Sequence, residues 1–186
     1  MEIIDNFFEE EYFNHIQSKI LHADHPWYYM DNISIGKEIT TRETDLRYGF
    51  NYSLIKSDDK GYDLGEMNKF IYDVSIAANA NVALRSRMDM TTNRGESYKL
   101  EPHVDFEYPH ITTIFYVNDS DGNTIIYNQK YNDRDKYDQK LTVKEEIEPV
   151  ANRLLIFDGL FIHTGHTPSK HNRRILINSN FKYREP

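Results

Sequence analysis

Residues 153–180 read RLLIFDGLFIHTGHTPSKHNRRILINSN, and this stretch decides the fold of the chain. Two short apolar runs flank Asp158-Gly159, a dipeptide that favours a tight hairpin turn, and a third run follows Arg173-Arg174. Short runs rich in Ile, Leu and Phe, with turn residues between them, are typical of buried β-strands. The stretch therefore predicts strands over 153–157, 160–164 and 174–180.

Earlier segments repeat this pattern. Alternating or short apolar runs, with a turn at Asp121-Gly122, predict further strands at 82–90, 111–118, 124–127 and 143–147. On the first of these strands we expect one apolar face, made of Val82, Leu84, Met88 and Met90. Arg85 and Arg87 then fall on the opposite face. There we expect a surface ladder of ion pairs rather than the mouth of a site.

Two helices are expected before the strand-rich part of the chain. Residues 9–22 carry apolar side chains at helical spacing and end before His25-Pro26, and a second helix is expected from about Leu64 to Ala80. A short entry strand is expected at Ile3-Ile4. Helices followed by many short strands predict a mostly-β fold with flanking α-helices, a jelly roll or sandwich. We expect one domain over 1–186, with a helical flank and entry strands at 1–81 and a barrel core at 82–182.

Composition excludes several classes of protein. The chain has 186 residues, and its 22 Lys and Arg against 30 Asp and Glu give a net charge of −8. An acidic chain is poorly suited to nucleic acid or to an anionic membrane surface, so neither is expected as a partner. The absence of cysteine excludes disulfides and thiolate metal sites. No apolar run is long enough to span a membrane and the N-terminus is acidic, so we expect a cytoplasmic protein. Its oligomeric state is left open.

His103-Val104-Asp105 is the first candidate for chemistry. On a strand, residues two apart face the same side, so both polar side chains can reach one metal ion. His163, 60 residues later, is the candidate third ligand, with His166 as its alternative. Two His and one carboxylate occupy one face of an octahedron and leave three positions open, which suits non-haem Fe(II) and O2. Alone, such a pair is more often a surface or hydrogen-bonded pair.

An arginine follows the distal histidine at the start of the last strand. A guanidinium pairs bidentately with a carboxylate, so a dicarboxylate cosubstrate could chelate the metal at one end and pair with Arg at the other. Arg173 and Arg174 alternate, so only one of them faces the cavity. Arg174 shares its phase with Asn178 and Asn180, and we expect this polar set to line the cavity while the apolar set packs under the helices.

These motifs resemble a known family. The order His-x-Asp, distal His and then Arg is similar to that of the Fe(II)/2-oxoglutarate-dependent dioxygenases, and most similar to their prolyl-4-hydroxylase-like branch. The resemblance rests on His103–Asp105, 115–118 and 148–157. It implies a double-stranded β-helix (jelly-roll) barrel, with Fe(II) on His103, Asp105 and His163. It also implies 2-oxoglutarate as cosubstrate on Arg174 with help from Tyr116, O2 as oxidant, and ascorbate as an optional reductant.

The reaction implied by the resemblance is hydroxylation of an unactivated C–H bond, with release of succinate and CO2. The substrate would be a peptide, a protein or a small molecule, and a prolyl residue is the candidate that the family favours. Two alternatives stay open: a cupin-like metal enzyme that does not use 2-oxoglutarate, and an inactive barrel that binds a small acid or a partner protein. We expect residues 128–140 to be a solvated loop or a lid, and His110 and His171 to be solvated.

Overall fold

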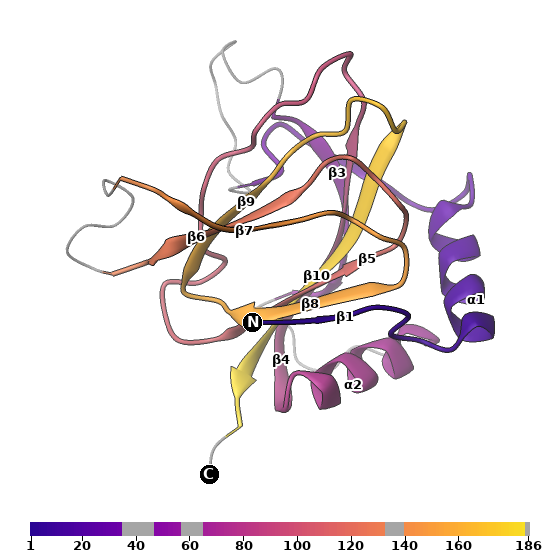
Figure 1. Cartoon of the computed structure of the whole chain (residues 1–186). Coiled ribbons are helices and arrows are strands. Elements are labelled where there is room, and N and C mark those ends of the chain that lie inside the picture. The colour runs from indigo at the N-terminus through magenta and orange to yellow at the C-terminus, as the bar shows by residue number, and fades with distance from the viewer. Residues whose placement is uncertain (35–46, 57–64, 133–139, 185–186) are drawn as a thin grey trace.

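The computed structural model describes residues 1–34, 47–56, 65–132 and 140–184, and shows two packed sheets with helices on one side (Figure 1). No helix among these residues is long and apolar enough to cross a membrane. In chain order the elements are β1 (Glu2–Ile4), α1 (Glu10–Leu21), β2 (Tyr28–Met30), β3 (Gly49–Ile55), α2 (Met67–Ala77), β4 (Ala80–Thr92), β5 (Ile111–Tyr116), β6 (Thr124–Lys130), β7 (Val143–Ile147), β8 (Arg153–Asp158), β9 (Phe161–Gly165) and β10 (Arg173–Tyr183).

The described strands form two antiparallel sheets. The larger sheet has seven strands in the order β1-β8-β5-β10-β4-β3-β2, and the smaller sheet has three in the order β7-β6-β9. Strands that follow one another in the chain often lie in different sheets, as expected for a jelly roll. The predicted mostly-β fold with flanking helices is therefore confirmed. The larger sheet extends beyond the smaller one at β4, β3 and β2.

β10 lies at the centre of the larger sheet, paired to β5 on one side and to β4 on the other. Its residues Ile175, Ile177 and Phe181 are fully buried in the core under the helices. Arg174 and Asn178 alternate with them and line a cavity on the opposite face. The predicted phase of this strand is confirmed: the apolar set packs under the helices and the polar set faces the space between the sheets.

An aromatic cluster joins both helices to the larger sheet. The ring of Phe115, on β5, has its centroid 5.3 Å from Phe8, 6.2 Å from Phe13 on α1 and 5.3 Å from Phe70 on α2. Phe70 and Phe115 are at most 1% exposed. Edge-to-face aromatic pairs of this kind add about 0.5–1.5 kcal/mol to the burial of the rings. Figure 1 shows the two helices on the same side of the larger sheet, away from β6, β7 and β9.

The predicted hairpin at Asp158-Gly159 is wrong. β8 pairs with β5 and β1, whereas β9 pairs with β6 in the other sheet, so the chain crosses between the sheets at this dipeptide. The side chains of β8 and β9 are largely buried on both faces of each strand. The two strands therefore lie in different sheets of the sandwich rather than side by side in one hairpin. Gly159 is required here for space, because a Cβ atom on it would lie 2.1 Å from the imidazole of His110.

The expected apolar face of β4 is also wrong in part. Asn180 pairs with Arg85 and Phe181 with Ala83, so Leu84 is the extra residue of a β-bulge. The bulge reverses the phase of the strand. Met88 is buried under the helices as expected, whereas Val82 is 44% exposed.

The sequence pattern did not predict β2 or β3, and it ended β6 too early. β6 continues through residues 128–130, which were expected to be loop. Residues 133–139 of the expected loop or lid lie outside the described residues. The second helix begins at Met67, and Leu64 also lies outside the described residues.

The first prediction concerns Asn152, which has a φ of 63° and exchanges two hydrogen bonds of 2.9 and 2.8 Å with the backbone of Phe8. Asn152→Ala loses both bonds and places alanine, which tolerates the left-handed region less well than asparagine, at this position. We expect it to lower the free energy of unfolding by about 2–4 kcal/mol. Asn152→Gly is the matched control: it loses the bonds but not the backbone freedom, and should cost about 1 kcal/mol less. Denaturant unfolding that shows no loss for Asn152→Ala would contradict this account.

Candidate functional site

Three side chains that could hold a metal ion meet between the two sheets. The ligand atoms of His103, Asp105 and His163 all lie within 4.8 Å of one another, and the described residues contain no other such group. His103 and His163 exchange backbone hydrogen bonds of 2.9 Å in both directions. This isolated bridge sets the two imidazoles side by side, with ring centroids 4.8 Å apart. The structure thus brings together the three residues that the sequence singled out.

The local geometry differs from the one expected. His103 makes only this single bridge to β9, and Asp105 lies in a bend rather than on a strand. The convergence of the two side chains therefore comes from the bend, not from the alternation of a regular strand. Val104 is buried with Ile125 and Ile162 on the outer side of the smaller sheet, and this packing anchors the motif.

The donor set fits a divalent cation. Nδ1 of His103 donates to the carbonyl of Glu101 at 2.8 Å, and Nδ1 of His163 donates to the carbonyl of Phe161 at 3.0 Å. A ring that donates from Nδ1 keeps a lone pair on Nε2, the atom that binds a metal. Nε2 of His163 is buried with no hydrogen-bond partner among the described residues. Burial lowers the pKa of His163, and burial together with the nearby His163 lowers the pKa of His103 to about 3, so both imidazoles are neutral at pH 7.

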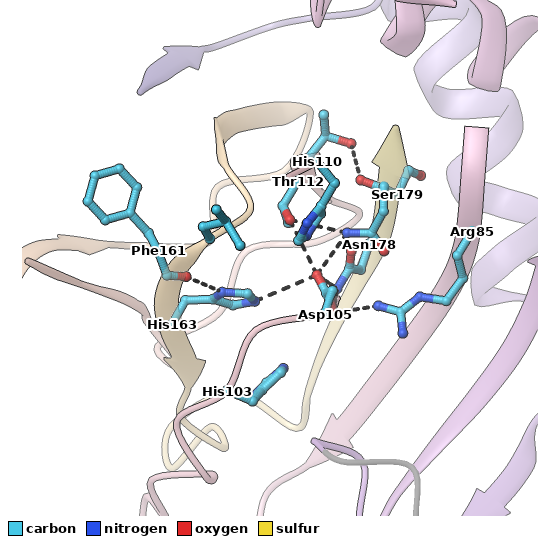
Figure 2. Close-up of polar contacts among 12 residues, drawn as sticks. Arg85, His103, Asp105, His110, Thr112, Phe161, His163, Asn178 and Ser179 are labelled. Carbon is cyan, nitrogen blue, oxygen red and sulfur yellow. Dashed lines mark hydrogen bonds and ion pairs between the residues drawn. The ribbon is translucent and has the colours of Figure 1, made fainter. Parts of the chain in front are cut away.

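Asp105 supplies the negative charge of this group. Its side chain is 4% exposed, and it accepts hydrogen bonds from Asn180 at 2.8 Å and from Asn178 at 3.2 Å (Figure 2). It also forms an ion pair with Arg85. Burial alone would raise the pKa of Asp105, but the positive charge of Arg85 and the bond from Asn180 hold it well below its usual range. The carboxylate is ionised. The sequence did not reveal these partners, although it placed both asparagines in phase with Arg174.

Arg174 lies at the other end of the cavity, 6% exposed. Its guanidinium donates to Oγ1 of Thr124 at 2.7 Å, and the hydroxyl of Tyr116 donates to the same atom at 2.7 Å. A Cβ atom on Gly165 would lie 3.1 Å from the guanidinium, so the glycine leaves the room that Arg174 occupies. Arg174 has no ion-pair partner among the described residues, an unfavourable state for a buried charge.

One cavity joins the two ends. Among its lining residues are His103 and His163 at the first end and Thr124, Gly165 and Arg174 at the second. Tyr116 is fully buried beside Arg174, and burial raises its pKa, so its hydroxyl stays protonated. Thr124 is a residue that the sequence analysis missed, because a threonine at the start of a strand carries no distinctive signal.

Arg85 and Arg87 correct another expectation, since they do not form a surface ladder. Arg85 reaches Asp105, and Arg87 lines the cavity with a side chain only 14% exposed. Nε of Arg87 lies 2.7 Å from the carboxylate of Asp89, and its Nη2 donates to the carbonyl of Ile33 at 3.1 Å. Both arginines face the site because the smaller sheet does not cover β4. Alternation places them on one face but cannot show which face is solvated.

His166, His171 and His110 are not among the grouped candidate ligands. His166 forms a bridge with Lys99 and is not among the ligands brought together. His171 is exposed, as expected, and contacts Asp121. The expectation for His110 is wrong: its side chain is fully buried against Gly159, and its Nδ1 donates to the carbonyl of Tyr108 at 2.8 Å.

With this geometry in place, the comparison with protein families is decisive. The model of the 2OG-Fe(II) oxygenase superfamily matches residues 88–182, just over half of the chain, so the chain belongs to this superfamily. The matched segment contains the His-Asp-His group and Arg174. The superfamily implies Fe(II), 2-oxoglutarate and O2 as cofactor, cosubstrate and oxidant. No curated protein matches the sequence significantly.

Solved structures share the fold at low sequence identity. A prolyl hydroxylase from Trichoplax adhaerens, in complex with a peptide of hypoxia inducible factor, is 16% identical with a TM-score of 0.61 over 97% of this chain and 82% of that chain. A prolyl-4-hydroxylase from Pseudomonas putida is 11% identical with a TM-score of 0.61 over 97% and 91%. The epimerase SnoN, with Fe3+, alpha ketoglutarate and a nogalamycin compound, is 10% identical with a TM-score of 0.64 over 97% and 77%. These likenesses establish the fold alone.

The loop that leads into β10 is fixed by Asp121. Its carboxylate accepts hydrogen bonds of 3.0, 2.9 and 3.0 Å from the backbone N–H groups of Ser169, Lys170 and His171. It also accepts one of 2.7 Å from the hydroxyl of Ser169. Partial burial works to raise the pKa of Asp121, but these bonds outweigh it and hold the pKa well below its usual range. Asp121 thereby sets the start of the strand that carries Arg174.

The second prediction follows from this lowered pKa. A carboxyl group with a lower pKa in the folded state stabilises the fold above its unfolded pKa, and that stabilisation is lost as the pH falls through the acid range. Asp121→Asn should therefore cost about 2 kcal/mol at pH 7, and the difference from wild type should shrink below about pH 4. Asp24→Asn, at a 91% exposed side chain, is the control. Denaturant unfolding that gives the same difference at pH 7 and pH 3 would refute the assignment.

Proposed function

We propose that this protein hydroxylates an unactivated C–H bond of an organic substrate, with Fe(II) held by His103, Asp105 and His163 and 2-oxoglutarate held by Arg174. The observation that carries the proposal is the buried guanidinium of Arg174, which has no acidic partner among the described residues. It lies at one end of a cavity whose other end holds two neutral histidines and an ionised aspartate. A dianionic keto acid that is bound to a divalent cation at one end of the cavity and reaches Arg174 at the other would supply the missing partner at both ends.

At the metal end, the chain supplies two neutral imidazoles and one carboxylate. The carbonyls of Glu101 and Phe161 fix the tautomer of each ring, and the bonds from Asn178 and Asn180 fix the orientation of the carboxylate. Three protein ligands would leave positions on the metal for the cosubstrate and O2. When bound, the metal, 2-oxoglutarate and O2 together supply the oxidising chemistry, with succinate and CO2 as the products of the cosubstrate.

At the cosubstrate end, Arg174 would bind the distal carboxylate. Thr124 would add a second donor, because its Oγ1 already accepts from Arg174 and Tyr116 and its own hydroxyl hydrogen remains to be donated into the cavity. Tyr116 then acts through Thr124 by holding that hydroxyl in place. Ile114 and Leu176 line the cavity between the two ends and keep it apolar where the carbon chain would lie.

The substrate would approach from the open side of the cavity, where the larger sheet extends beyond the smaller one. Peptides, proteins and small molecules are the candidate classes, and a prolyl residue is the one that structural neighbours with prolyl hydroxylase activity suggest. Ascorbate is proposed as the reductant that keeps the iron ferrous between turnovers.

The two alternatives fit less well. A cupin-like enzyme without 2-oxoglutarate would need a further His or Glu at the metal, and the described residues bring none into the group. It would also leave the buried guanidinium of Arg174 without an anionic partner. An inactive barrel that binds a small acid would need Arg174 but not the buried Nε2 of His163, which has no hydrogen-bond partner among the described residues, at the other end.

The third prediction tests the reaction and the metal ligands together. Wild-type protein with Fe(II), ascorbate and O2 should convert 2-oxoglutarate to succinate slowly without substrate, measured by chromatography. His163→Ala should lose metal binding, measured by calorimetry with a redox-silent divalent cation, and at least about 100-fold of the succinate rate. His166→Ala, three residues away, is the matched control and should keep both. No succinate from the metal-loaded wild type, or equal effects of the two variants, would refute the proposal.

The fourth prediction separates two neighbouring arginines. Arg174→Met removes a buried charge-assisted partner of the cosubstrate and should weaken 2-oxoglutarate binding by roughly 30- to 1000-fold, or about 2–4 kcal/mol. Arg173→Met, in the opposite phase of β10, should cost less than about 1 kcal/mol. Titration calorimetry on the metal-loaded variants measures both. A large loss in Arg173→Met with little change in Arg174→Met would reverse the assignment.

A further inference from the structure

Three arginines lie at the site of a chain whose net charge is −8: Arg87 and Arg174 line the cavity, and Arg85 contacts Asp105. Arg174 lies at the cosubstrate end, and Arg87 is neutralised by Asp89 at 2.7 Å. Arg85 lies beside the metal group, where its only acidic partner among the described residues is Asp105, a proposed metal ligand. Neither the cosubstrate nor a structural ion pair accounts fully for this third cation.

Arg85 reaches the metal group from β4. Its Nη2 contacts Oδ1 of Asp105, whereas Oδ2 of the same carboxylate lies 3.7 Å from Nε2 of His163 (Figure 2). The two oxygens of Asp105 thus serve different neighbours, and the metal side belongs to Oδ2. Figure 2 shows Arg85 on the side of Asp105 opposite to His163. A group bound to Arg85 would therefore lie next to the metal without competing for its protein ligands.

The guanidinium of Arg85 has binding capacity left. Its contact with Asp105 is made by Nη2, and 23% of the side chain remains exposed, whereas Nε is buried. The ring of Phe106, with its centroid 5.4 Å from Cζ, supports one face of the guanidinium. A supported and partly exposed guanidinium is suited to binding an anion through its terminal N–H groups, and the carboxylate is the common organic anion that forms such charge-assisted hydrogen bonds.

We propose that Arg85 binds a carboxylate of the substrate, so that the substrate is a small organic acid whose reacting C–H bond lies a few bonds from that carboxylate. The proposal rests on the proposed function, because the charge of Asp105 is shared with the metal once the metal is bound. Arg85 then carries positive charge that its single partner does not neutralise. The short distance between the carboxylate and the reacting C–H bond follows from the direct contact of Arg85 with a proposed metal ligand. In an acid anchored there, the carbons nearest to the carboxylate would lie over the metal.

Arg85 could instead serve only to position Asp105. In that case its N–H groups would need no further partner, and an added carboxylate would leave them unchanged. Arg87 provides an internal control for this distinction. It lies on the same face of β4, but Asp89 neutralises it, so an added carboxylate should not bind to it.

The test uses full-length protein labelled with 15N-arginine, loaded with Zn(II) and saturated with 2-oxoglutarate so that Arg174 is occupied. The Nε–H signal of Arg85 is assigned by its absence in Arg85→Lys, a variant that keeps the charge, and folding is checked from the other arginine signals. We expect acetate to shift this signal saturably, with a midpoint on the order of 10–100 mM for one charge-assisted pair. Acetamide, its neutral analogue, should not shift it, and the Arg87 signal should not move.

Equal shifts with acetate and acetamide, or no shift with either, would overturn the proposal and leave Arg85 as a positioning residue for Asp105. Calorimetry with 2-oxoglutarate is run first on the same Zn(II)-loaded sample. Failure at that step would overturn the proposed function itself, and the inference with it. Success there followed by no response to acetate would overturn the inference alone.

Discussion

The alternation of side chains along β10 is the constraint on which the rest of the structure depends. Ile175 and Ile177 are fully buried under the helices, while Arg174 and Asn178 line the cavity. One strand thus supplies the centre of the apolar core and one wall of the site. A slip of one residue in its register would exchange the two faces and bury a guanidinium under the helices. The pairing of β10 with both β4 and β5 excludes that slip.

Two opposite charges are then buried at the ends of one cavity. Asp105 is held ionised by Arg85 and by the amides of two asparagines, whereas Arg174 donates to the hydroxyl of Thr124 and has no ion-pair partner among the described residues. Burying a charge without a counter-charge is costly, and the cost falls when a ligand supplies the missing partner. A divalent cation at the first end and a dicarboxylate that reaches the second would complete both. The binding of these two groups would therefore also stabilise the fold.

Much of this arrangement could be predicted from the sequence, because it depends on local periodicity. The phase of β10 followed from its polar and apolar alternation, and His103, Asp105 and His163 were correctly expected to meet. What failed depends on which sheet covers a strand. Alternation could not show that Asp158-Gly159 crosses between sheets, that Leu84 is a bulge, or that Arg85 faces the site. Thr124 escaped notice because only its three-dimensional neighbours give it a role.

We infer above all that the two ends of this cavity bind one keto acid together. The most direct measurement is the visible absorption of the Fe(II)-loaded protein under strict exclusion of O2, recorded while 2-oxoglutarate is added. The account predicts a weak metal-to-ligand charge-transfer band that grows and saturates with the keto acid, because chelation places its carboxylate and keto oxygens on the metal. Succinate, which lacks the keto group, should give no band. Binding of Fe(II) and 2-oxoglutarate without any such band would contradict the account.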